Sequence, residues 1–384
     1  MKLNNRLSNI NEYHFKKIDD MKNEIRMSGK KIIDLSIGDP DLAVHSTITD
    51  ALIEGLKDAR YNNYPPYDGI IDLKKAVIKY YKQVYSVCLD LAEVIILIGS
   101  KEGISNIIPA VCDVSDCVIV PEPAYPVYSI CSKLWGCLPY TVPLKQTNGY
   151  LIELNTIPQQ IVSKCKLIFM NYPNNPTGAV ASSEFYKQII KFSYENDIVL
   201  CNDSAYNEII KIDKKPISLM QYDVKRQCVE FGTLSKTYNM TGYRIGYAVG
   251  NAKVINALLK VKSNCDSGQF IPVQKAAIAA INLERDYVCD LRKIYDERRE
   301  VAKRILLQKN IDFFDSEGTF YLWCKTPKNY TTDEFCEELL INNNIMVTPG
   351  NVFGKLGYDY FRIALTKDVL IIKEALKSLK KCDG

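Results

Sequence analysis

Residues 233–247 read TLSKTYNMTGYRIGY and place one lysine, several hydroxyls, two glycines and one arginine between two apolar segments. Residues 229–231 predict a strand before this stretch and residues 245–249 predict one after it, so the polar segment is expected to form a loop at a sheet edge. Loops in such places often carry chemistry. Apolar neighbours would strip water from Lys236, which lowers its pKa and favours a neutral amine that can form an imine.

Taken alone, the S-K-T tripeptide also fits a surface loop with a solvated lysine, but the match is longer than three residues. The stretch resembles the pyridoxal phosphate (PLP) lysine signature of the fold-type-I aminotransferases. Its form S-K-T-x-N-M-T-G-x-R-I-G looks like the branch that contains aspartate and LL-diaminopimelate aminotransferases. The resemblance implies that Lys236 is the catalytic lysine and that Thr233, Ser235 and Arg244 contact the cofactor. Many relatives have serine where this chain has Thr233, a change that keeps the hydroxyl.

Length and composition predict a globular chain of two or three domains, with 384 residues of which 47% are hydrophobic. The net charge of +4 is spread without a dense basic run, so neither nucleic acid nor a membrane is an expected partner. Thirteen scattered cysteines without a C-x-x-C pair indicate reduced thiols and a cytoplasmic enzyme. Two histidines are too few for a histidine-rich metal centre, and no metal site is expected.

The order of predicted strands indicates the fold class. Strands are expected to begin near residues 94, 117, 165, 198, 228 and 245, separated mostly by helices. This alternation predicts an α/β fold with a mainly parallel, doubly wound sheet, whose ligands bind at strand ends. The last hundred residues predict a smaller α+β lobe with two helices and strands at 311–314, 319–325, 345–348 and 358–365. The expected domains are 1–45 (N-terminal arm), 46–282 (large, PLP-binding) and 283–384 (small).

Two strand ends predict contacts to a cofactor. Residues 94–104 begin with an apolar run and continue with Gly99, Ser100 and Lys101. This pattern predicts a strand, a tight turn and a helix start, an arrangement that presents backbone N–H groups to an anion. Such junctions are common in α/β folds, but this one matches the phosphate-binding turn of the family. Tyr125 follows the next strand, and the resemblance implies that its ring stacks on the pyridine.

Two further strand ends carry polar groups. An N-P-T-G turn follows the strand at 165, and the resemblance implies that Asn175 donates a hydrogen bond to the phenolate oxygen of the cofactor. Asp203 ends the strand at 198, where an unpaired carboxylate would be costly. A pyridinium nitrogen would provide its partner and keep the ring an electron sink. Tyr206 is expected beside Asn175, and both Asp203 and Tyr206 are candidate catalytic residues.

The resemblance also implies contacts to the substrate and across a homodimer. Gly38 would lie beside the substrate carboxylate, and Arg362, on an apolar strand, would bind that carboxylate bidentately. From the local residues alone, Arg362 also fits an arginine that points outward from an edge strand. Tyr64 would reach the cofactor phosphate of the other subunit, and Tyr67 is the neighbour that could be confused with it.

Other segments carry less specific signals. The first thirty residues look helical and amphipathic. Five arginines between 283 and 308 stand among acids at helical spacing and favour a solvated helix face. The loop at 39–45 lacks the second proline that the branch usually has after P-D-L, which could shape substrate choice. The segment S-N-x-D-S-G-Q-F at 263–270 looks like a feature of diaminopimelate aminotransferases.

Together these motifs predict a PLP-dependent aminotransferase that acts on an amino acid and 2-oxoglutarate. LL-diaminopimelate is the leading amino donor, which would place the enzyme in lysine and cell-wall precursor biosynthesis. Aspartate or aromatic transamination is the alternative within the class. A PLP-dependent lyase of the same fold is an alternative of another class. A cofactor-binding regulator is a third, although no residues remain for a separate DNA-binding domain.

Overall fold

The structure is a computed structural model that describes residues 31–381, together with 4–8, 10, 22, 25, 27 and 29. Most of the predicted N-terminal helix lies outside the described residues, and α1 (Asn5–Ser8) is the part of it that can be compared. In the part that is described, no helix is both long and apolar enough to cross a bilayer.

The central sheet has seven strands in the order β2-β8-β7-β6-β5-β3-β4. They are β2 (Val94–Leu97), β3 (Cys117–Glu122), β4 (Leu138–Pro143), β5 (Cys165–Met170), β6 (Val199–Asp203), β7 (Val229–Thr233) and β8 (Gly246–Gly250). All neighbours from β7 to β4 are parallel, whereas β8 is antiparallel to both β7 and β2. The predicted mainly parallel α/β sheet is therefore confirmed.

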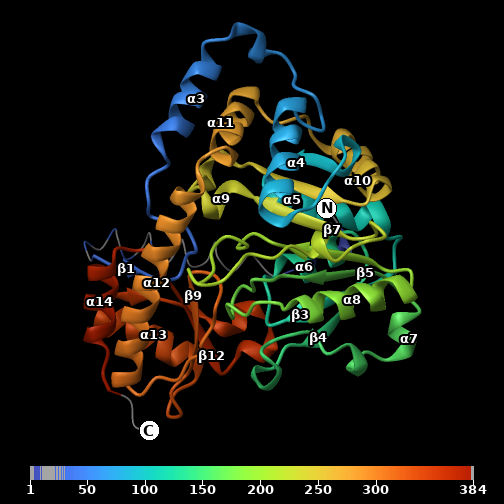
Figure 1. Cartoon of the computed structure of the whole chain (residues 1–384). Coiled ribbons are helices and arrows are strands. Elements are labelled where there is room, and N and C mark those ends of the chain that lie inside the picture. The colour runs from blue at the N-terminus through green and yellow to red at the C-terminus, as the bar shows by residue number, and fades with distance from the viewer. Residues whose placement is uncertain are drawn as a thin grey trace.

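Helices cover this sheet because its strands are apolar on both faces. All four residues of β2 are buried, for example, which is typical of strands enclosed by helices. Figure 1 shows the sheet among its helices. The α-helices between residues 46 and 281 are α3 (Ser46–Leu56), α4 (Ile71–Tyr85), α5 (Ser100–Val111), α6 (Val127–Leu134), α7 (Gln159–Val162), α8 (Ser183–Glu195), α9 (Leu234–Thr237), α10 (Ala252–Cys265) and α11 (Ile271–Ile281).

The sequence analysis missed strand β4, which lies at the edge of the sheet. Pro139 and Pro143 interrupt its apolar pattern, and proline cannot donate a ladder hydrogen bond. An edge strand tolerates proline because one side of it has no neighbouring strand. The strand is therefore set by its pairing with β3 rather than by its own sequence.

The C-terminal residues build two smaller sheets, one of them together with a strand from the N-terminal segment. β1 (Ile33–Asp34) pairs in parallel with β10 (Ile345–Met346), and β11 (Thr348–Pro349), β12 (Tyr360–Ala364) and β9 (Tyr321–Lys325) form an antiparallel sheet. The helices of this lobe are α12 (Arg285–Gln308), α13 (Thr332–Asn343) and α14 (Val369–Ser378). Of the predicted strands, 311–314 provides only an isolated bridge at Phe313, and 345–348 divides between two sheets. The division into domains stays a prediction.

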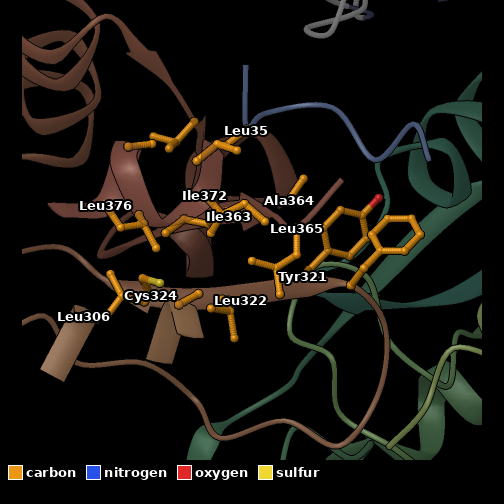
Figure 2. Packing of buried hydrophobic residues seen from close by; sticks show 14 of the residues in the cluster. Leu35, Leu306, Tyr321, Leu322, Cys324, Ile363, Ala364, Leu365, Ile372 and Leu376 are labelled. Carbon is orange, nitrogen blue, oxygen red and sulfur yellow. The ribbon is translucent and has the colours of Figure 1, made fainter. Parts of the chain in front are cut away.

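The core of this lobe joins residues that are far apart in the sequence. Figure 2 shows Leu35, which directly follows β1, packed with Leu306, Leu322, Ile363 and Leu376 from α12, β9, β12 and α14. Because Leu35 is fully buried here, the segment that follows β1 is anchored to the C-terminal lobe. This anchoring places residues 36–39 beside the end of β12, where Leu35 O accepts a hydrogen bond from Ala364 N.

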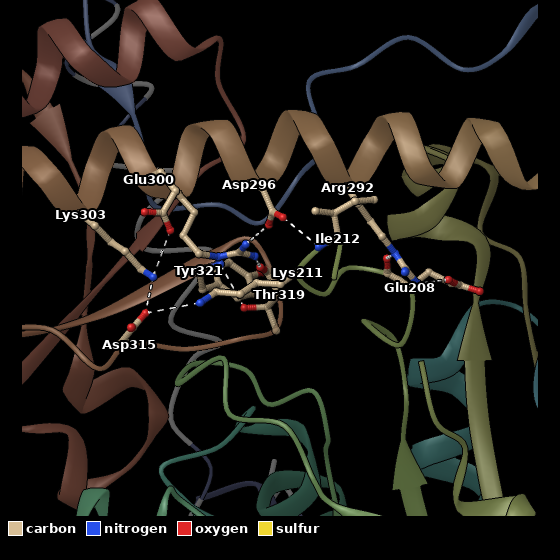
Figure 3. Close-up of polar contacts among 11 residues, drawn as sticks. Glu208, Lys211, Ile212, Arg292, Asp296, Glu300, Lys303, Asp315, Thr319 and Tyr321 are labelled. Atoms are coloured by element: carbon tan, nitrogen blue, oxygen red, sulfur yellow. Dashed lines mark hydrogen bonds and ion pairs between the residues drawn. The ribbon is translucent and has the colours of Figure 1, made fainter. Parts of the chain in front are cut away.

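The solvated arginine face predicted for α12 is wrong for three of its five arginines. Arg292, Arg298 and Arg299 are buried, and each pairs with a carboxylate, as Figure 3 shows for Arg292 and Glu208. Arg292 Nη2 lies 2.5 Å from Glu208 Oε2, and Arg298 Nη1 lies 2.7 Å from Asp41 Oδ1. Glu208 and Asp41 come from other elements, so the helix sequence could not reveal the burial of Arg292 and Arg298, whereas Arg299 pairs with Asp296 of the same helix.

Candidate active site

The lysine segment is a short helix rather than the predicted loop at a sheet edge. β7 and β8 are inner strands, and α9 begins directly after Thr233. The Thr233 side chain caps α9 by accepting a hydrogen bond from Ser235 N, and a 3-10 turn at Thr241–Tyr243 follows. The helical turn directs Lys236 toward the ends of the parallel strands β6 and β7.

Lys236 meets the N-terminal segment inside a cavity. Its Nζ donates to Gly38 O at 2.6 Å. Loss of hydration on burial lowers the pKa of Lys236 to about 8, opposed by the negative charge of Asp39 and aided by Arg362 and Arg244. A much larger fraction of this amine is therefore neutral at neutral pH than in an exposed lysine.

Asp203 offers an unpaired acceptor at the end of β6. Its Oδ2 accepts a hydrogen bond from Tyr128 Oη at 2.8 Å, whereas Oδ1 is buried and accepts none from the part of the chain that the structure describes. Burial raises the pKa of Asp203 to about 6, although Tyr128, the Ala205 amide and Lys236 favour the charged form. At pH 7 the group is ionised, with one oxygen open to a cationic donor.

Arg362 is fully buried rather than pointing outward from the sheet. Its Nη1 donates to Asn175 Oδ1 at 2.7 Å, and its Nη2 donates to Ser36 O at 2.6 Å. The guanidinium carbon lies 4.0 Å from the ring centroid of Tyr321. Three separate stretches therefore hold the guanidinium plane in one orientation at the cavity wall.

The start of α5 forms a cradle for an anion together with the lysine segment. Gly99 adopts a φ of 75°, and a Cβ there would lie 2.7 Å from Arg244 Nη2, so glycine allows this arginine to approach the helix start. Ser100 and Lys101 begin α5, and their backbone N–H groups lie at its positive dipole end. Hydroxyls, cations and a helix N-terminus are the groups that bind a phosphate.

One cavity of about 510 Å³ collects all of the predicted site residues except Tyr64. Those that line it are Gly38, Ser100, Lys101, Tyr125, Asn175, Asp203, Tyr206, Thr233, Ser235, Lys236, Arg244 and Arg362. Tyr64 is 89% exposed and does not line the cavity. Its expected contact with a second subunit stays a prediction.

The sequence analysis missed other lining residues, including Tyr128, Tyr321 and Asp39. Tyr128 lies three residues after Tyr125 on the first turn of α6, and this spacing could have suggested a shared face. Tyr321 lies beside Arg362 because β9 pairs with β12, and its Oη lies 3.0 Å from Tyr206 Oη. No local signal in the sequence indicates that pairing.

Comparison with known proteins relates the whole chain to one family. Residues 30–379 match the family model for class I and II aminotransferases. The chain is 44% identical to the LL-diaminopimelate aminotransferase of Natranaerobius thermophilus over 97% of this chain and 96% of that protein. It is 43% identical to the enzyme of the same name from Aquifex aeolicus, covering 98% and 97%. Substrate-bound BacF from Bacillus subtilis superposes with a TM-score of 0.95 at 32% identity, covering 98% and 97%.

Proposed function

This chain belongs to the class I and II aminotransferases, and from that membership we propose that it is a PLP-dependent LL-diaminopimelate aminotransferase with 2-oxoglutarate as amino acceptor. The observation that carries the proposal is the grouping of Lys236 Nζ, the unpaired Asp203 Oδ1 and the buried Arg362 in one cavity. The names of the two relatives support the choice of amino donor.

The residues present fit PLP. The orphaned Asp203 Oδ1 is the acceptor that a protonated ring nitrogen needs, and Tyr125 supplies an aromatic face. Asn175 uses its oxygen for Arg362, which leaves its amide nitrogen to donate to a phenolate oxygen beside Tyr206. The phosphate would bind Ser100, Lys101, Thr233, Ser235 and Arg244.

When bound, PLP supplies an electron sink that stabilises negative charge at the substrate α-carbon. Lys236 would hold the cofactor through Nζ, and its amine in the neutral form would take the proton from the substrate α-carbon and later return it. Its lowered pKa suits this exchange, because an amine of pKa about 8 both accepts and returns a proton near neutral pH. The amino group passes from donor to acceptor, so a 2-oxo acid and glutamate are the products.

Arg362 binds the α-carboxylate of both substrates, with Gly38 beside it. A guanidinium fork matches a carboxylate bidentately, and the contacts with Asn175, Ser36 O and Tyr321 orient the fork before substrate arrives. Gly38 has no room for a larger residue, since a Cβ there would lie 1.6 Å from Tyr321 Oη. We place the enzyme in the cytoplasm as a homodimer with shared sites and with the three domains predicted above.

An amino-donor panel tests the proposal. Purified holoenzyme is given LL-diaminopimelate, aspartate or an aromatic amino acid with 2-oxoglutarate, and glutamate formation is measured. We expect kcat/KM for LL-diaminopimelate to exceed the others by at least about tenfold, or about 1.4 kcal/mol of transition-state binding. A preference for aspartate or an aromatic donor would select the alternative within the class. Release of ammonia or pyruvate without a 2-oxo acid acceptor would indicate a lyase.

A further inference from the structure

Tyr128 contacts two groups of the active site without any role assigned to it so far. It lies on the first turn of α6 and is 1% exposed. Its hydroxyl donates to Asp203 Oδ2 at 2.8 Å, and its ring meets Tyr125 edge to face at a centroid distance of 6.0 Å. On its other side the ring stacks on Phe169, with centroids 5.2 Å apart. The side chain is therefore held by packing as well as by its hydrogen bond.

The hydroxyl makes the two oxygens of Asp203 unequal. Oδ2 is occupied by Tyr128, and Oδ1 is left as the buried oxygen without a partner among the residues described. Turning the carboxylate plane away from this orientation would break the bond to Tyr128 in a buried site, which is costly. The bond from Tyr128 therefore selects the oxygen that remains available.

The same bond supports the charge of Asp203. Burial raises the pKa of Asp203 to about 6, and Tyr128 is the leading group that opposes this rise, followed by the Ala205 amide and by Lys236 on α9. Tyr206 also lies close enough for its own pKa to respond to Asp203. Without the Tyr128 hydroxyl, the balance moves toward a neutral carboxyl group at pH 7.

We propose that Tyr128 is a positioning residue whose hydroxyl turns one oxygen of Asp203 toward the cofactor ring nitrogen and keeps the carboxylate ionised, while its ring supports Tyr125. This inference rests on the proposed function, because it needs PLP in the cavity. It gives a role to a tyrosine that acts through its neighbours rather than on the substrate.

The variant Tyr128→Phe removes the hydroxyl and keeps the ring. Tyr81→Phe is a matched control, because Tyr81 Oη also donates at 2.8 Å to a buried carboxylate, that of Glu230, and does not line the cavity. In the apo protein, carboxyl ¹³C NMR, assigned with Asp203→Asn, should show that Tyr128→Phe raises the pKa of Asp203 by about 1–2, whereas Tyr81→Phe leaves it unchanged. An unchanged pKa in Tyr128→Phe would overturn the inference.

Two further measurements separate positioning from packing. Fluorotyrosine at position 128 keeps the shape but donates more strongly, so it should lower the pKa of Asp203; a rise would contradict the proposal. The Kd for PLP of Tyr128→Phe should be about two- to tenfold weaker than wild type at pH 7 and equal at pH 9, where Asp203 is ionised in both. Wild-type protein that fails to bind PLP would reject the proposed function, whereas wild-type binding with equal affinity in the variant at pH 7 would reject only the role of Tyr128.

Discussion

At the level of single residues, the cavity holds ionisable groups in states that cost stability. Asp203 is 5% exposed and has one oxygen that accepts no hydrogen bond from the described residues, and Lys236 loses hydration in the same cavity. Their pKa values move toward neutrality from opposite directions, to about 6 and about 8. Such convergence is typical of groups that exchange protons or pair with a ligand.

We expect Asp203→Asn to stabilise the apo protein at pH 7 by about 1–3 kcal/mol while lowering the rate of the loaded enzyme. The folded state raises the pKa of Asp203 from 3.8 to about 6, so its ionisation costs stability as pH rises through this range. The gain in the variant should be complete above pH 6 and absent below about pH 4. The free energy of unfolding in urea, compared between the variant and wild type at pH 7 and at about pH 4, measures this gain.

Asp290→Asn is the control for this comparison, since Asp290 is exposed and forms its ion pair with nearby Lys293 on the same helix. It should change the free energy of unfolding by less than about 1 kcal/mol. Equal stabilities of Asp203→Asn and wild type at pH 7 would mean that the carboxylate is not strained in the apo protein.

Arg362→Lys should weaken both half-reactions alike. An ammonium cannot reproduce the fork that contacts Asn175 and Ser36 O, and it cannot stack on Tyr321 in the same way. We expect a loss on the order of 2–5 kcal/mol in transition-state binding for the amino acid and for 2-oxoglutarate. Single-turnover kinetics of each half-reaction would measure kcat/KM separately. A loss confined to one substrate would show that the two carboxylates do not share Arg362.

Among the elements, helix α12 shows how charged residues can form an interior contact. Glu208 is buried and accepts hydrogen bonds from Arg285 at 2.7 Å, from Arg292 at 2.5 Å and from Tyr80 at 2.7 Å. Burial alone would raise the pKa of Glu208, but these donors together lower it. The helix is thereby attached to the segment that follows β6, close to Tyr206 of the cavity.

Glu208→Gln should destabilise the protein by about 3–5 kcal/mol, because it leaves Arg292 buried without its charge partner. Glu184→Gln removes a carboxylate from an exposed pair with Lys187 and should leave the free energy of unfolding close to that of wild type. The free energy of unfolding in urea compares the two variants. Similar small losses would show that the buried pair contributes no more than a surface pair.

At the scale of the whole molecule, the active site depends on three distant parts of the chain. Lys236 Nζ donates to the N-terminal segment at Gly38, and Arg362 of the C-terminal lobe donates to Asn175 in the turn that follows β5. The cavity therefore forms only when the lobe is docked on the sheet. The exposed Tyr64 is the one predicted site residue that does not line this cavity.

Mixing two inactive variants tests whether Tyr64 completes the site of a second subunit. In a hybrid of Tyr64→Phe and Lys236→Ala chains, one site would have both residues intact and the other would lack both. Random exchange of equal amounts should restore about a quarter of the wild-type sites, because half of the dimers are hybrids. Activity is measured after subunit exchange, with heterodimers verified by mass spectrometry. Heterodimers without restored activity would show that Tyr64 does not act across the interface.

Much of the molecule was predictable where function depends on residues close together in the sequence. The parallel sheet followed from apolar runs separated by helices, and Asp203 was expected from its place at the end of a strand, whereas most other site residues were implied by the resemblance to the family. The motif around Lys236 indicated the family because a phosphate-binding lysine segment needs particular side chains at particular spacing. These features were available because they are local, or because parallel strands end at a common edge.

The remaining features depend on contacts between residues far apart in the sequence. The prolines of β4 are tolerated because the strand lies at the sheet edge, and Arg292 and Arg298 of α12 are buried against acids from other segments. Tyr128 became part of the site through its bond to Asp203, 75 residues away. The sequence by itself determined which chemical groups are available and where strands place them. Only the tertiary structure decided which groups share a dry cavity, because burial and pairing arise from the packing of the whole chain.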